Sequence, residues 1–200
     1  MKITKKSRQI LLSMVLGDGA LNKKGVLSIR HSLAQKNYLE WKNDLLNKNG
    51  ISTTGTYYVS NNNHGACEFK TYTHNFIKLY KRVLYNPKKN ISRKFLNKLN
   101  SQGLAIWYMD KGGLSRRKLK NNTYTIKELI LNTGFQKVEN QIIIDYFNDV
   151  WGIKFSQVKN KSVYKLRCGK YEAIKFINIV KKSILQVNCM SYKIDVNHIV

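Results

Sequence analysis

Two segments of this sequence place a charged residue and a glycine at the end of an apolar run, LLSMVLGDGAL (11–21) and LAIWYMDKGGL (104–114). Apolar residues lie on nearly every side of both runs, which predicts buried helices. Asp18 lies at the C-terminal end of the first helix, where the helix dipole disfavours a carboxylate by up to about 1 kcal/mol. An acid at this place needs another role, and carboxylate oxygens bind Mg²⁺. Asp18 is therefore a candidate metal ligand for metal-assisted phosphodiester hydrolysis.

The two segments begin two halves in which similar elements follow in the same order. The first half is predicted to hold a helix at 6–18, a strand at 26–32, a helix at 37–49, strands at 53–60 and 67–73, and a helix at 75–85. The second is predicted to hold a helix at 102–111, a strand at 128–133, a helix at 138–150, strands at 153–159 and 162–168, and a helix at 171–182. We therefore predict an α+β fold of two α-β-β-α-β-β-α repeats, residues 1–100 and 101–200.

Polar and apolar residues alternate along two of these strands, so one sheet face should be buried and the other polar and basic. The polar positions are Ser28 and Arg30 in the first half, and Lys165 and Arg167 in the second. An antiparallel sheet with such a face could lie in the major groove of DNA, which admits a two-stranded β-ribbon. The alternative is an ordinary solvent-facing side of a sheet.

The charge balance favours a nucleic-acid partner. The chain has 36 Lys and Arg against 11 Asp and Glu, a net charge of +25, and these charges are spread along the sequence instead of lying on one amphipathic helix. A spread of this kind argues against a membrane-surface protein and for a polyanionic partner. We expect phosphate contacts from Lys70 and from two basic runs in polar, loop-like stretches, one with Lys88, Lys89, Arg93 and Lys94 and the other with Arg116, Arg117, Lys118 and Lys120.

Composition excludes several other classes of protein. With 42% hydrophobic residues and one proline the chain should fold, and no apolar stretch approaches the roughly 18 residues that a membrane span needs. Three widely spaced cysteines suggest neither a disulfide framework nor a zinc site. We expect a soluble protein in a reducing intracellular compartment, with the mitochondrial or another organelle matrix as one candidate.

The paired motifs, about 93 residues apart, resemble those of single-chain, two-repeat LAGLIDADG homing endonucleases, which are often intron-encoded and whose motifs read LGDG and LAxWxMDDGG. The segment CMSYKI (189–194) is also similar to the C-terminal segment of that group, and the resemblance covers essentially the whole chain. It implies a saddle of two antiparallel sheets over DNA, with catalytic acids at the ends of paired helices. It also implies a monomer with internal pseudo-dimer symmetry.

The resemblance assigns catalytic positions and shows one departure. Asp18 matches the first catalytic acid, and Lys193 and Lys89 match lysines that assist near the scissile phosphates. The second catalytic acid of the group precedes the first glycine of DDGG, and here that residue is Lys111, after Asp110. A unit charge about 4 Å from an ion is worth roughly 4 kcal/mol at an effective dielectric near 20, so a cation here opposes Mg²⁺ binding.

Two functions follow from this departure. The first is site-specific binding of double-stranded DNA with Mg²⁺-dependent cleavage impaired or lost. The second is a nuclease-dead RNA-binding protein, either a group I intron maturase or a structural component of an organellar ribonucleoprotein. Mg²⁺ is the expected cofactor if the protein cleaves, and otherwise none is expected. Phosphate contacts carry no sequence information directly, so the charge alone does not choose between DNA and RNA.

Overall fold

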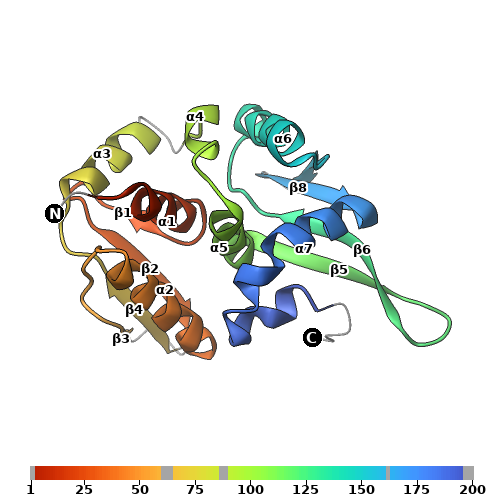
Figure 1. The fold of residues 1–200 in the computed structure, drawn as a ribbon, viewed down its shortest axis with the longest axis horizontal. Coiled ribbons are helices and arrows are strands. Elements are labelled where there is room, and N and C mark those ends of the chain that lie inside the picture. The colour runs from red at the N-terminus through yellow and green to blue at the C-terminus, as the bar shows by residue number, and fades with distance from the viewer. Residues whose placement is uncertain (1–2, 60–64, 86–89, 161–162, 196–200) are drawn as a thin grey trace. The chain divides into compact units, whose positions relative to one another are not determined.

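A computed structural model describes residues 3–59, 65–85, 90–160 and 163–195. Backbone contacts divide the chain into two compact units, residues 1–89 and 90–200, and each builds a four-stranded antiparallel sheet (Figure 1). The predicted α+β class with two antiparallel sheets is confirmed. Within the described part of the chain, no helix has the length and apolar character needed to cross a membrane.

The first unit follows the predicted order of helices and strands. Its elements are α1 (Lys5–Leu16), β1 (Ala20–Leu21), β2 (Leu27–Ser32), η1 (Leu33–Gln35), α2 (Lys36–Lys48), β3 (Tyr57–Val59), β4 (Ala66–Lys70) and α3 (Asn75–Leu84). The strands lie in the order β1-β2-β4-β3, and α2 packs on β2 and β4. Leu27 and Ile29 of β2 are fully buried while Arg30 is exposed, which confirms the predicted alternation.

The second unit repeats that order after one short additional helix. Its elements are α4 (Arg93–Leu96), α5 (Ser101–Lys111), β5 (Gly112–Lys118), β6 (Tyr124–Leu131), α6 (Lys137–Trp151), β7 (Ser156–Asn160), β8 (Val163–Gly169), α7 (Lys170–Ile184) and η2 (Asn188–Lys193). The strand order is β5-β6-β8-β7. The division between the units precedes α4, which packs on α6, whereas the predicted repeat boundary follows residue 100.

The helices that carry the two sequence motifs are buried, as predicted. Residues 10–16 of α1 and residues 103–109 of α5 are all buried in succession, so each helix is surrounded on every side. In the second unit, Trp107 stacks on Phe147, with ring centroids 6.1 Å apart, and Tyr108 lies against Phe176 at 5.2 Å. Each motif therefore ends at the edge of a rigid core, which fixes the position of the residues that follow.

Three strand predictions need correction. The α-β-β-α-β-β-α order implies a first strand in each half, but the residues predict no range for it, because β1 has two residues and β5 begins with two glycines followed by a basic run. Arg116 and Arg117 consequently lie in a strand instead of a loop, since β5 pairs with β6 through residue 118. The predicted strand at 53–60 is reduced to β3 and one isolated bridge between Thr53 and Thr71.

Candidate functional site

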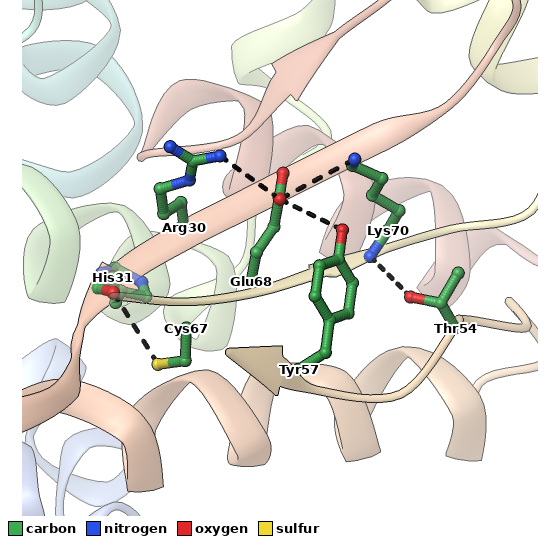
Figure 2. A network of polar contacts seen from close by, with 7 residues as sticks. All are labelled: Arg30, His31, Thr54, Tyr57, Cys67, Glu68 and Lys70. Carbon is green, nitrogen blue, oxygen red and sulfur yellow. Dashed lines mark hydrogen bonds and ion pairs between the residues drawn. The ribbon is translucent and has the colours of Figure 1, made fainter. Parts of the chain in front are cut away.

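A polar row crosses three strands of the first sheet on the face opposite α2. Arg30 on β2 and Tyr57 on β3 both pair with Glu68 on β4, so the three side chains lie next to one another. The Glu68 carboxylate accepts a hydrogen bond from the Tyr57 hydroxyl at 3.1 Å and one from the Arg30 guanidinium at 3.4 Å (Figure 2). Lys70 Nζ lies 3.7 Å from the same oxygen.

This row holds cations at fixed places on the sheet. The Glu68 side chain is only 9% exposed, whereas those of Arg30 and Lys70 are 48% and 46% exposed. A hydrogen bond that Lys70 donates to the Tyr57 side chain and then the Glu68 charge raise the pKa of Lys70 above its usual range, so the ammonium stays charged. Ser28 pairs with Lys70 on the same face. The structure thus brings the predicted residues Ser28, Arg30 and Lys70 together around an acid that the sequence analysis did not single out.

The second sheet carries a similar arrangement. Arg167 of β8 lies 3.7 Å from the Glu128 carboxylate of β6, and its side chain is 53% exposed. Lys165, two residues earlier on β8, lies on the same face and pairs with Val158. Leu166 between them is fully buried on the other side. Both predicted residues, Lys165 and Arg167, therefore lie on the polar face of the sheet.

Neighbouring arginines of the β5–β6 hairpin have different surroundings. The ladder shifts register after Ser115, and Arg116 then pairs with the buried Ile126. The Arg116 guanidinium donates hydrogen bonds to the carbonyl of Tyr192 at 3.0 Å and to that of Asp195 at 2.9 Å. Arg116 thus holds the C-terminal segment by hydrogen bonds. Its place in a basic run of the sequence does not indicate this role. The exposed members of the predicted run are Arg117, Lys118 and Lys120.

The acid of the first motif lies just beyond its helix. α1 ends at Leu16, so Asp18 belongs to the turn that leads into β1, and its side chain is 28% exposed. Asp18 Oδ2 lies 3.9 Å from Nδ1 of His31, which β2 places on its buried face. On the far side of the imidazole, His31 Nε2 is hydrogen-bonded to Lys42 Nζ at 3.0 Å.

Sequence reasoning missed both members of this buried pair. The four histidines have no metal-ligand spacing, and in α2 the sequence pattern favours the apolar residues Trp41 and Leu45 as members of the buried face. Those two residues are only half-buried, whereas Lys42 is fully buried. The available signal was a lysine four residues after Tyr38 and four before Leu46, on the same face of the helix.

The end of the second motif is fastened to the C-terminal segment. Lys193 Nζ donates a hydrogen bond to the carbonyl of Gly112 at 2.7 Å, and the Tyr108 hydroxyl donates one to the carbonyl of Lys193 at 2.8 Å. Lys111 is the last residue of α5, immediately before Gly112. The structure thus places the predicted lysines Lys193 and Lys111 at the same end of α5. Lys89, the other predicted lysine, lies outside the described residues.

The side chains at the ends of the two motifs differ in their ability to bind a metal ion. Asp18 offers a half-buried carboxylate, and Mg²⁺ commonly binds one or two carboxylates together with water and phosphate oxygens. The first motif therefore fits the ion. At the corresponding place of the second motif Lys111 offers an ammonium, which has no lone pair to donate.

Comparison with known proteins agrees with this architecture. Residues 8–176 match the model of the LAGLIDADG DNA endonuclease family. The chain belongs to this family. Among its LAGLIDADG relatives, "Probable intron-encoded endonuclease 1" of Wickerhamomyces canadensis is 31% identical over 98% of this chain and 86% of its own length. "Probable intron-encoded DNA endonuclease 3" of Mycosarcoma maydis is 29% identical over 63% of this chain and 90% of its own.

Solved structures of the LAGLIDADG fold match as well. The homing endonuclease I-WcaI bound to its DNA recognition sequence superposes with a TM-score of 0.80 and 26% identity, over 99% of this chain and 89% of that one. I-DmoI in complex with DNA and Mn gives a TM-score of 0.55 at 14% identity, over 88% of this chain and 96% of that one, a likeness of fold alone.

Proposed function

We propose that this protein binds double-stranded DNA at a specific site through the polar faces of its two sheets. The observation that carries the proposal is the matched arrangement on those faces, where one exposed arginine is held beside one carboxylate in each sheet, Arg30 with Glu68 and Arg167 with Glu128. A guanidinium fixed in this way keeps donors free for guanine O6 and N7, the commonest specific contact in the major groove. Ordinary solvent-facing sheet sides need no such fixed cations.

Two further observations support duplex DNA. The structure of I-WcaI was determined with its DNA recognition sequence, and this chain matches it over nearly its full length. The net charge of +25 suits a polyanion, and the exposed Arg117 and Lys118 add cations beyond the part of β6 that pairs with β8. Base contacts would give specificity, while these peripheral cations would contact phosphates and set the register.

We also propose that cleavage is impaired because the two motifs are chemically unequal. Asp18 can hold Mg²⁺, which when bound polarises a phosphate oxygen and activates water. Lys193 is held at the end of α5 by its bond to the Gly112 carbonyl, and we assign it to the phosphate side of the site. Lys111 supplies positive charge where the group has an acid. That residue is also the feature that favours the second candidate, a nuclease-dead RNA-binding protein.

Alanine at Arg30 or Arg167 should weaken duplex binding by about 1 to 3 kcal/mol and relax the base preference at one position. This loss corresponds to a roughly 5- to 150-fold rise in Kd. The reason is that each substitution removes a donor pair aimed at base edges while leaving the buried sheet face intact. Fluorescence anisotropy with a labelled duplex and its single-base variants measures both effects.

The matched control for these variants is Arg93→Ala. Arg93 pairs with Asp149 at 2.8 Å between α4 and α6, away from the sheet faces, so its loss removes the same charge and a similar ion pair. Its Kd should change little, and its base preference should stay that of the unmodified protein. Equal losses in all three variants would show that only net charge matters, and would contradict the proposed interface.

A further inference from the structure

An acid lies at the centre of the basic sheet face of the first unit. The Glu68 side chain is 9% exposed, and donors from β2, β3 and β4 surround its carboxylate (Figure 2). Tyr57 and Arg30 donate hydrogen bonds to Oε2 at 3.1 Å and 3.4 Å, and Lys70 Nζ lies 3.7 Å from the same oxygen. Because a carboxylate repels phosphate oxygens, an acid here opposes the affinity of this face for any duplex. Its presence requires an explanation other than affinity.

The carboxylate joins two cations on neighbouring strands. Strand pairing places Arg30 opposite Glu68, and Lys70 lies two residues further along β4 on the same face. The two cationic side chains are about half-exposed, whereas the acid between them is nearly covered. A long side chain that is already held in one place loses less conformational freedom when it contacts a partner. Glu68 therefore prepares both cations for contacts of defined geometry.

Tyr57 holds the acid from the third strand. β3 pairs Tyr57 with Glu68, and the hydroxyl fixes the carboxylate without adding a charge. Lys70 Nζ also lies 5.8 Å from the centroid of the Tyr57 ring. The four side chains form one connected network, in which the acid is the common member.

We propose that Glu68 is a positioning residue that lowers the affinity for duplex DNA in general and raises the discrimination between sequences. It holds Arg30 and Lys70 so that each meets the O6 and N7 acceptors of a guanine. A duplex without these guanines still meets the carboxylate and gains no base contact in return, so it binds less well. The bases that face the first sheet therefore include guanines at two positions. The inference rests on the proposed function, because it needs this face to contact DNA.

Two affinities of the full chain, measured side by side by fluorescence anisotropy, test the inference. One is for a duplex site selected from a random pool, and the other is for an unrelated duplex of the same length. Glu68→Gln keeps the shape of the side chain and removes its charge. Affinity for the unrelated duplex should rise, and its dependence on salt should steepen by about one unit of slope, because one more phosphate is neutralised. The ratio of the two affinities should fall by about 5- to 150-fold, the range for one bidentate base contact.

Glu40→Gln is the matched control. Glu40 pairs with Lys36 at 3.6 Å on α2, which packs on the opposite face of the same sheet. This variant makes the same substitution and removes the same charge, and its affinity ratio should equal that of the unmodified protein. A change of net charge alone would affect both variants equally.

Two further variants separate orientation from charge. Tyr57→Phe removes the hydroxyl that holds the carboxylate, so the affinity ratio should fall while the affinity for the unrelated duplex stays the same. When Arg30→Ala and Lys70→Ala are combined, adding Glu68→Gln should not change the ratio further, because the acid acts through these two cations. A purely structural role would instead lower both affinities in every background.

Two outcomes would overturn this inference and leave the proposed function standing. The first is an unchanged affinity ratio in a Glu68→Gln variant that still binds the selected site. The second is an equal loss of both affinities, which would show that Glu68 only supports the fold. Failure of the unmodified protein to select any site would overturn the proposed function and this inference together. If Glu68→Gln does not fold, an unchanged ratio in Tyr57→Phe overturns the inference and a lowered ratio supports it.

Discussion

Replacing Lys111 with aspartate should raise Mg²⁺-dependent cleavage of a plasmid that carries the bound site by about 10³-fold or more. A unit charge about 4 Å from the ion is worth roughly 4 kcal/mol at an effective dielectric near 20, and each 1.4 kcal/mol is a factor of ten in rate. Lys111 ends the buried helix α5, so the substitution changes the charge at a fixed place without disturbing the core. Conversion of supercoiled plasmid to nicked and linear forms measures the effect.

Two control variants separate the parts of this prediction. Lys111→Met removes the cation without adding a ligand, so its cleavage rate should lie between those of the unmodified protein and Lys111→Asp. Asp18→Asn combined with Lys111→Asp should abolish the gain, because it removes the carboxylate of the first motif. Efficient double-strand cleavage by the unmodified protein would show that Asp110 or another acid serves in place of Lys111. An inert Lys111→Asp variant that still binds DNA would show that the loss of activity extends beyond this residue.

Duplex affinity should fall by about 10³- to 10⁵-fold as the salt concentration rises from about 50 to 200 mM, the range for a protein that neutralises six to ten phosphates. The physical cause is release of the counterions condensed on DNA, which is less favourable when the bulk salt is higher. The exposed cations on the sheets and on the β5–β6 hairpin are sufficient in number to neutralise that many phosphates. Anisotropy titrations at several salt concentrations give the slope of log affinity against log salt concentration.

Arg116 and Arg117 form a matched pair of adjacent residues for the same experiment. Arg117 is exposed, so Arg117→Ala should reduce the magnitude of the slope by about one. The Arg116 guanidinium donates its hydrogen bonds to the carbonyls of Tyr192 and Asp195. Arg116→Ala should therefore leave the dependence of log affinity on log salt concentration nearly unchanged. A flat salt response, or equal slopes in the two variants, would contradict the assignment of these surfaces.

The sequence was informative where structure depends on local pattern. Alternation in β2 and β8 correctly predicted which sides of the two sheets are buried, because side chains of a strand point to opposite faces in turn. Gly50 and Gly152 follow the ends of α2 and α6, and their φ angles of 76° and 63° lie in the left-handed region that favours glycine after a helix. Both features need only a few neighbouring residues.

Sequence patterns failed where the position of a residue depends on distant partners. Arg116 lies in the same basic run as Arg117, and only the register shift after Ser115 turns it toward the C-terminal segment. Arg30 of β2 and Glu68 of β4 are paired in the sheet, although the chain between these strands includes the whole helix α2. Lys42 reaches His31 from another element, so no motif spacing could have predicted their contact.

Selection from a pool of randomised duplexes, in competition with a pool of structured RNA at physiological salt, tests the central claim most directly. The proposed interface predicts that one family of related DNA sites is enriched and is bound at least about 10³-fold more tightly than unrelated duplex. Arg30→Ala should lose part of that preference. Retention of RNA without enrichment of any duplex sequence would contradict site-specific DNA binding and would support the RNA-binding alternative.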